Sequence, residues 1–196
     1  MTAKIKLNAA SGGGSFSLQA PSSSSNNRVL TLPDSADGTI AKTSDISFTS
    51  YAIIADQKSQ NTNGGAFTAG DWRTRDLNTE LSDENGIVSI SSNQFTLGAG
   101  SYLIIGKAPA YDCNRHQVRI QNITDSTTTG TGIPLYLHTS YNPTNISEVV
   151  CRTSISTSKV FELQHRAESD KSNGGFGLAG NFGVEIYATV QIYKEV

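Results

Sequence analysis

Several features that often reveal a function are scarce in this chain of 196 residues. Cys113 and Cys151 lie far apart, which excludes a metal site with CxxC spacing; we expect two free, mostly buried thiols, with a disulfide as the alternative. The longest apolar runs, such as YLII at 102–105, are far shorter than the roughly 20 residues of a membrane-spanning helix. No apolar segment of a secretory signal follows Met1, so we expect synthesis in the cytosol without that route of export.

Charge is scarce as well. Charged residues make up 16% of the chain, against roughly 25% in an average soluble domain. The 15 Lys and Arg nearly balance the 17 Asp and Glu, so the net charge of −2 gives no electrostatic footprint for nucleic acid or an anionic membrane. Ser, Thr, Asn and Gly are abundant instead, and they favour turns and sheet surfaces over helix interiors. The composition therefore predicts an all-β protein.

The pattern of apolar residues from residue 47 onward supports this prediction. No stretch of 12 residues shows a helical apolar period, whereas short strand-like runs recur between turns rich in Gly, Asn, Ser and Asp. Many short strands at this spacing predict a sandwich, a barrel or a jelly roll. The expected strands lie near 50–56, 71–77, 87–91, 93–97, 101–110, 115–123, 134–139, 147–155, 159–167 and 183–194.

Two of these strands have a distinctive alternation. The strand at 101–110 carries apolar residues on both faces, so we expect it to be covered on both sides. In the last strand, Tyr187 and Tyr193 fall on the face opposite the expected core, which suits a half-buried surface between subunits. The expected core face of this last strand comprises Val184, Ile186, Ala188, Val190 and Ile192.

Residues 1–46 form a different kind of segment. KIKLN at 4–8 and RVLTLPD at 28–34 are short strand signals, separated by a glycine run and a Ser/Asn-rich stretch. The few large apolar residues are too few for an independent core, so the segment must pair with copies of itself or dock on a partner. The apolar residues expected to make that attachment are Ile5, Leu7, Phe16, Leu18, Leu30 and Leu32.

Several stretches resemble known proteins. NQFTLGAGSYLIIGKAPAY at 93–111 resembles the strand–turn–strand signature of C1q/TNF-like jelly rolls, and FGVEIYATVQIYKE resembles the last strand of that fold. The stretches at 56–80, 114–125 and 161–169 resemble the heads of bacteriophage tail fibres and virion appendages. SLQAPSSSSNNRVLTLPDSADGT at 17–39 resembles the N-terminal segments of phage fibre and stalk proteins. Residues 126–147 depart from these patterns.

The resemblance implies a homotrimeric virion protein of tail or capsid, made in the host cytoplasm. Residues 1–46 would be the attachment and trimerisation segment, a β-rich stalk or collar that docks on other virion proteins. Residues 47–196 would be a C1q/TNF-like jelly-roll head that binds a host surface glycan or protein. The alternative is a capsid or neck head fibre or decoration protein with a purely structural role. A glycan-degrading tailspike is a third possibility.

The residues that could carry catalysis do not form a recognisable motif. His116 and His165 alternate with apolar residues on predicted strands, which indicates structural histidines. No nucleophile, zinc or phosphate-loop motif is present, so we expect neither enzymatic activity, nor a metal site, nor a cofactor. Arg73 and Arg75 are interleaved with acidic residues, and this pattern favours a salt-bridged surface or an intersubunit strand over a catalytic carboxylate pair. The acidic residues are Asp71, Asp76, Glu80, Asp83 and Glu84.

Binding residues are therefore sought on loops and exposed strand faces. Arg115, Gln117, Arg119 and Gln121 share one strand face, which could contact another subunit, solvent or an anionic glycan. The candidate receptor-contact residues are Asn61, Asn63, Tyr136, His138, Tyr141, Asn142, Asn173 and Phe176. The candidate trimer-interface residues are Tyr102, Arg115, Arg119, Tyr187 and Tyr193.

Overall fold

The computed structural model describes residues 4–19, 23, 25, 48–138, 141 and 143–195. The chain divides into two compact units, Met1–Ile40 and Ala41–Val196. The predicted boundary between residues 46 and 47 lies outside the described residues, as do the predicted strand at 28–34 and the attachment residues Leu30 and Leu32.

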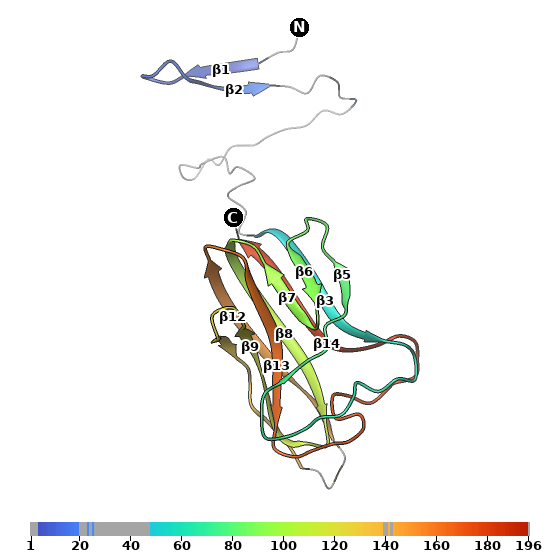
Figure 1. Ribbon diagram of the computed structural model, residues 1–196. Helices are drawn as coiled ribbons and strands as arrows, with labels where there is room; N and C mark the ends of the chain where they lie inside the picture. Colours follow the sequence, from blue (N-terminus) through green and yellow to red (C-terminus); the bar gives the residue numbers. More distant parts are fainter. Residues whose placement is uncertain are drawn as a thin grey trace, which may run out of the picture. The chain divides into compact units, whose positions relative to one another are not determined.

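The first unit contains one β-hairpin, formed by β1 (Lys4–Asn8) and β2 (Ser15–Gln19) (Figure 1). Ile5 pairs with Leu18 in this register. The side chains of Ile5, Leu7 and Leu18 are 64%, 59% and 42% exposed. An isolated two-stranded hairpin is at best marginally stable in water. This hairpin therefore presents apolar side chains that no described residue of its own unit covers.

The second unit is built from two sheets. The five-stranded sheet has the order β12 (Thr144–Ile155), β8 (Gly100–Tyr111), β14 (Glu185–Glu195), β3 (Phe48–Lys58), β5 (Thr79–Ser82). The seven-stranded sheet has the order β10 (Thr127–Thr131), β9 (Asn114–Asn122), β13 (Lys159–Ala167), β7 (Gln94–Leu97), β6 (Val88–Ser91). Within it, β11 (Leu135–Leu137) also pairs with β9, and β4 (Arg73–Thr74) pairs with β13.

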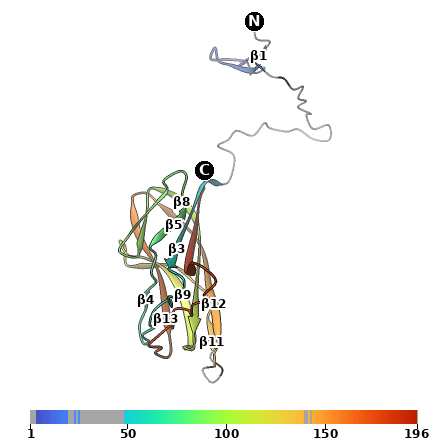
Figure 2. The ribbon, with the colours of Figure 1, turned by 90° about the vertical axis from the view of Figure 1, so that its right-hand side faces the viewer.

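The long strands alternate between the two sheets, since β8, β12 and β14 belong to one and β9 and β13 to the other. All the pairings are antiparallel. The sheets lie face to face (Figures 1 and 2), and this double-sheet arrangement is a jelly roll. The prediction of an all-β sandwich is therefore confirmed.

The core fills the space between the two sheets. Tyr102 and Ile104 of β8 face inward and are almost fully buried, whereas Leu103 and Ile105 face outward and are half-buried. Phe95 of β7 stacks on Phe161 of β13, with ring centroids 5.5 Å apart. The remaining buried apolar residues of the core are Ala52, Ile54, Leu77, Val88, Leu97, Ala108, Val118, Ile120, Val149, Leu163, Ala188, Val190 and Ile192.

The face predicted for the last strand is only partly correct. Ile186 pairs with Gln57 of β3 and Thr189 with Ala55, so β14 contains one extra residue between these two pairs. Such a bulge changes the face on which the following side chains lie. Val184 and Ile186, predicted to be in the core, are consequently 66% and 41% exposed. Ala188, Val190 and Ile192 do face the core.

Some strand boundaries also differ from the predictions. The strand expected at 71–77 is reduced to two residues, Arg73 and Thr74. The sequence pattern did not predict β5 or β10. β10 has the sequence TTTGT, which contains no large apolar residue, and it is formed by pairing with β9. Apolar alternation therefore could not reveal it.

Candidate functional site: a groove beside an aromatic cluster

A groove of about 500 Å³ lies over the pairing of β9 with β13 in the seven-stranded sheet. His116 and Ala167 are paired there and both are buried, so their neighbours along each strand point outward. The floor of the groove is thus the sheet itself, and its sides are polar side chains. The lining residues are Gly70, Arg115, His116, Gln117, Pro134, Arg166, Ala167 and Glu168.

Some polar side chains of the groove are held by hydrogen bonds to other described residues of the chain, and one is not. One guanidinium nitrogen of Arg115 donates to both carboxylate oxygens of Glu168, at 2.8 and 2.9 Å. The Gln117 amide donates to the carbonyl oxygen of Gly132 at 2.7 Å. The exposed Arg166 side chain forms no hydrogen bond or ion pair with another described residue. Arg166 is therefore the cation of the groove that remains available to a ligand.

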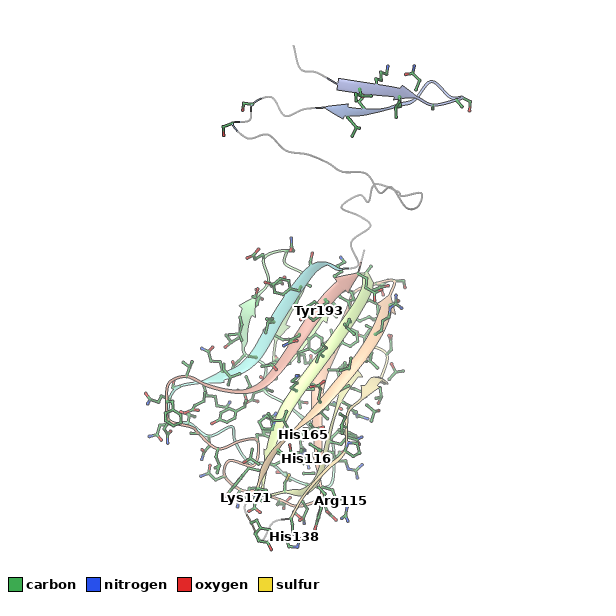
Figure 3. The ribbon with its side chains drawn as sticks, turned by 180° about the vertical axis from the view of Figure 1, so that it is seen from behind. Arg115, His116, His138, His165, Lys171 and Tyr193 are labelled. Atoms are coloured by element: carbon green, nitrogen blue, oxygen red, sulfur yellow. The ribbon has the colours of Figure 1, made fainter. Side chains whose placement is uncertain are left out.

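An aromatic cluster, formed by Tyr136, His138 and Tyr141, adjoins the groove. Tyr136 pairs with Arg115 across β11 and β9, and the Arg115 guanidinium lies 5.1 Å from the centre of its ring. His138 lies 6.1 Å from Tyr136 and 5.8 Å from Tyr141, measured between ring centroids. The two tyrosines are 56% and 82% exposed. Figure 3 shows Arg115 and His138 at the same end of the sandwich.

Of the eight candidate receptor-contact residues, the three aromatic-cluster residues are thus brought together, and Asn142 lies outside the described residues. Asn63 and Asn173 form a second pair, because the Asn63 amide donates to the Asn173 side-chain oxygen at 3.0 Å. The Asn63 oxygen in turn accepts a hydrogen bond from the backbone of Ala179. The backbone N–H of Asn61 donates to Glu185. These contacts fasten the loops at 58–67 and 169–181 to each other and to β14.

Phe176 requires a correction, because it is 9% exposed and lies inside the protein. Its ring packs on Phe67 with centroids 4.6 Å apart, and the Arg75 guanidinium lies 3.9 Å from its ring centre. A side chain enclosed in this way has no surface left for a receptor. The aromatic residue in the glycine-rich loop therefore belongs to a second, smaller buried cluster with Phe67.

Arg75 also differs from its prediction. The sequence pattern favours a salt-bridged surface, but the Arg75 side chain is completely buried. Its guanidinium donates to the carbonyl oxygens of Pro109 and Phe176 at 3.2 and 2.9 Å. Burial lowers the pKa of Arg75 to about 10, which still leaves the group charged at neutral pH. The nearby Asp56 carboxylate, also completely buried, favours that charge.

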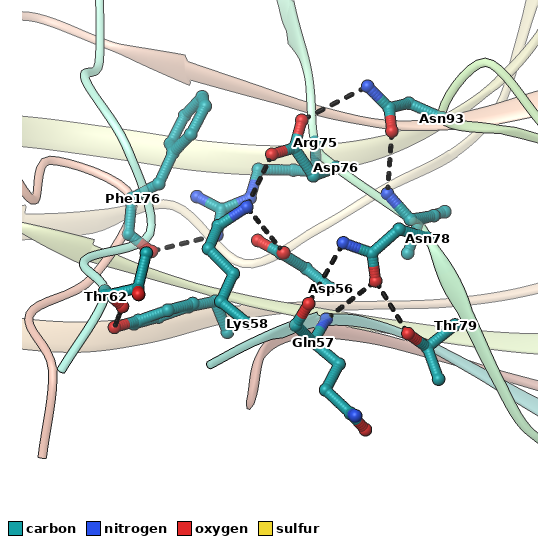
Figure 4. Close-up of polar contacts among 12 residues, drawn as sticks. Asp56, Gln57, Lys58, Thr62, Arg75, Asp76, Asn78, Thr79, Asn93 and Phe176 are labelled. Atoms are coloured by element: carbon teal, nitrogen blue, oxygen red, sulfur yellow. Dashed lines mark hydrogen bonds and ion pairs between the residues drawn. The ribbon is translucent and has the colours of Figure 1, made fainter. Parts of the chain in front are cut away.

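Sequence reasoning missed Asp56, the buried carboxylate near Arg75. Asp56 lies 3.0 Å from the Lys58 ammonium, which also contacts Asp76 at 2.8 Å (Figure 4). Burial raises the pKa of Asp56 despite the neighbouring Lys58. The signal was present in the sequence, because Asp56 continues the inward alternation of Ala52 and Ile54 along β3.

The two predicted structural histidines lie below the groove and contact each other. His116 Nδ1 and His165 Nε2 are 2.9 Å apart, which places one proton between the two rings. Burial, followed by the charge of Arg75, lowers the pKa of His116 to about 4 and that of His165 well below its usual value. Both rings are therefore neutral at pH 7, in keeping with structural roles.

The candidate interface residues are distributed over three places. Tyr102 is 1% exposed in the core, and its hydroxyl donates to the carbonyl oxygen of Gly98. Tyr187 is 8% exposed, and its hydroxyl donates to the carbonyl oxygen of Thr62. Both predictions are corrected here, because the two rings are already covered within one chain. For Tyr187 the cause is the bulge in β14, which turns the ring inward.

Arg115 and Arg119 lie on the outer face of the seven-stranded sheet, with partners inside their own chain. Arg119 donates from Nε to the side-chain oxygen of Gln164 at 2.8 Å, and its guanidinium lies 4.3 Å from the ring centre of Trp72. Arg115 is held by the Glu168 carboxylate. These partners order the polar face without a second subunit.

Tyr193 lies instead on the outer face of the five-stranded sheet, beside apolar side chains, Gln191 and the Arg152–Glu195 ion pair. Tyr51, Tyr193 and Leu103 are paired side by side across β3, β14 and β8, and Ile105 pairs with Val150. Tyr51 and Val150 are 48% and 55% exposed, and the other members are half-buried. We call this surface the open sheet face; its residues are Tyr51, Ile53, Leu103, Ile105, Val150 and Tyr193.

Neither a metal cluster nor a membrane helix is found in the part of the chain that the structure describes. No three His, Cys, Asp or Glu side chains there are grouped so as to hold a metal ion. No helix among those residues has the length and apolar character needed to cross a bilayer. Cys113 and Cys151 are both free, as expected, and burial raises the pKa of each thiol.

Comparison with known proteins finds structural neighbours but no relative in sequence. No protein-family model matches the chain, and no curated protein matches it in sequence. Murine APRIL at pH 5.0 matches with 8% identity and a TM-score of 0.49, over 74% of this chain and 98% of that chain. The globular domain of zebrafish complement 1qA matches with 15% identity and a TM-score of 0.47, over 74% and 96%. The jelly-roll assignment does not depend on these neighbours, because it rests on the strand order of the two sheets.

Proposed function

We propose that the chain is a non-enzymatic subunit of a homotrimeric phage virion appendage that binds the surface of a host cell. The observation that carries this proposal is the contrast between the two outer faces of the sandwich. The open sheet face gathers six apolar and aromatic residues around Gln191, bordered by the Lys107–Glu148 and Arg152–Glu195 ion pairs, which suits burial between copies of the chain. The opposite face carries the polar groove and the aromatic cluster. One face serves assembly and the other stays free for a ligand.

The N-terminal hairpin supports the same proposal. Ile5, Leu7 and Leu18 are exposed in a hairpin that is too small to be stable alone. In a trimer, three copies of this hairpin could bury these side chains around one axis or against another virion protein. The resemblance of residues 17–39 to phage fibre segments gives the hairpin the role of a virion attachment.

Adsorption competition tests the proposed function. The purified full chain is titrated into a mixture of phage and native host cells, and free phage is counted. We expect saturable inhibition at micromolar concentration or below. A well-folded trimer that leaves adsorption unchanged would reject host binding, and it would favour a head-fibre or decoration protein with a structural role.

A further inference from the structure

We infer that the groove between β9 and β13 binds an acidic saccharide, such as a uronate or sialate unit of a surface polysaccharide. The inference rests on the proposed function, because it names the ligand class of the surface that the trimer leaves free. It is carried by three properties of the groove: an unbalanced cation, adjoining exposed rings and a pre-ordered floor.

The charges of the groove favour an anion. Two guanidinium groups and one carboxylate line it, and Glu168 is already paired with Arg115. Arg166 therefore contributes a positive charge that no described residue pairs with. A guanidinium matches the geometry of a carboxylate with two parallel hydrogen bonds, which makes a sugar carboxylate a fitting partner.

The neighbouring side chains suit the rest of a sugar ring. Tyr136 has Arg115 near its ring and remains 56% exposed, so it offers a flat apolar surface with a hydroxyl at its edge. Tyr141 is 82% exposed and extends this surface through His138. The Gln117 amide donates within the chain, which leaves its oxygen as an acceptor for a ligand hydroxyl.

The floor and sides of the groove are ordered by the fold. β9 and β13 are paired from Asn122–Phe161 to His116–Ala167. Further along the same face, Gln164 receives a hydrogen bond from Arg119 and donates one to Glu162. A site built on paired strands loses little conformational freedom when it binds, which favours even a small ligand.

Isothermal titration of the full chain with short acidic oligosaccharides tests the inference. The probes are oligogalacturonate, oligomannuronate and oligosialate, each measured beside its neutral carboxyl methyl ester. We expect at least one acid to bind about tenfold more tightly than its ester, because only the carboxylate of the acid can form an ion pair with two parallel hydrogen bonds to Arg166. Arg166→Gln should remove that preference, while Tyr136→Ala should weaken acid and ester alike.

Lys6→Gln is the matched control, because it removes one exposed positive charge from the N-terminal hairpin and should leave binding unchanged. Thermal unfolding of Arg166→Gln should match the wild type, since the side chain has no ion pair with a described residue to lose. Equal binding of acids and esters, an unaffected Arg166→Gln chain, or no binding of any acid would each overturn the inference. Adsorption competition by the wild type remains a separate result, so host binding can stand when the acidic ligand fails.

Discussion

The contact between His116 and His165 makes folding stability depend on pH. Both histidines have pKa values below that of an unfolded chain, about 6.5, because both are buried near the charged Arg75. Between pH 6.5 and about 4 the unfolded chain therefore binds more protons than the folded one. The stabilisation from the neutral pair is complete above pH 6.5 and is lost as the pH falls.

We predict that the free energy of unfolding falls by about 1.4 kcal/mol per pH unit for each titrating histidine below pH 6.5. Urea unfolding at pH 7.5, 6.5, 5.5 and 5.0 measures this slope. Asp56 acts in the opposite sense, because burial raises its pKa. The histidine part is thus the difference between the wild type and a His116→Gln/His165→Gln chain.

A wild-type stability that stays constant down to pH 5, or a double variant with an unchanged slope, would contradict the buried neutral pair.

For single residues, the sequence predicted burial correctly at some positions and wrongly at others. Apolar alternation correctly indicated that His116 and His165 point into the sandwich, because their neighbours on the same strand faces are core residues. It placed Arg75 on the surface, because a charged residue in a polar stretch gives no sign that aromatic rings and carbonyl groups enclose it. Phe176 was wrongly predicted to be a surface residue, because the Arg75 side chain that covers its ring comes from a distant segment of the sequence.

At the scale of elements, two glycine-rich loops pack backbone against backbone. The N–H of Gly64 donates to the carbonyl oxygen of Gly177 at 2.9 Å, and the N–H of Phe176 donates to Gly65 at 3.1 Å. A Cβ atom on Gly64 would lie 2.9 Å from the carbonyl carbon and oxygen of Phe176. Backbone atoms held by hydrogen bonds cannot move aside as a flexible side chain could.

We predict that Gly64→Ala destabilises the protein by about 1–3 kcal/mol through this overpacking. Gly98→Ala is the matched control, because no atom lies within 4 Å of its added Cβ; it should change stability by less than about 0.5 kcal/mol. Chemical unfolding of the three chains measures the difference. Equal stabilities of the two variants would show that the loops separate at little cost.

The elements themselves were largely predictable, and their exceptions have physical causes. Long strands such as β8 and β13 are evident from their alternation, and their predicted limits lie close to the observed ones. The bulge in β14 has no apolar signature, because it arises from pairing with β3. The faces of Val184, Ile186 and Tyr187 therefore could not be read from the period of the sequence.

At the scale of the whole molecule, the open sheet face leads to a prediction about assembly. Ile105 is half-buried there, between Gln191 and Val150 of the neighbouring strands. We predict that Ile105→Asp converts the proposed trimer into monomers, because a buried unpaired carboxylate at an interface is strongly unfavourable. Light scattering coupled to size-exclusion chromatography measures the mass, and circular dichroism reports whether the sheets persist.

Ile133→Asp is the control, because Ile133 is 59% exposed and lies outside the open sheet face. That variant should remain trimeric. In adsorption competition the Ile105→Asp monomer should be weaker than the trimer by roughly 10²–10⁴, the range expected for lost avidity. A trimeric Ile105→Asp chain would exclude this face as the interface.

The sequence predicted the sandwich, but it did not predict which outer face of the sandwich contacts another subunit. Period-two alternation identifies which residues of a strand share a face, but it does not say whether an outer face meets water or another subunit. Tyr102, Tyr187 and Tyr193 were all predicted to be interface residues, and only Tyr193 reaches an outer surface. The groove depends on strands β9, β13 and β11, which are brought together by pairings far apart in sequence.

The layout of β3 has a mechanical consequence. β3 begins at Phe48, which pairs with Glu195 near the end of β14. β8 runs from this end of the sandwich to Tyr111, close in sequence to the start of β9. Its twelve residues span about 36 Å. A particle tethered through the N-terminal segment and bound at the groove would load the sandwich along its strands. β3 lies between β14 and β5, and its ladder hydrogen bonds run across that load. The bonds would be sheared together rather than unzipped one by one, so the sandwich would resist tension applied between Phe48 and the groove.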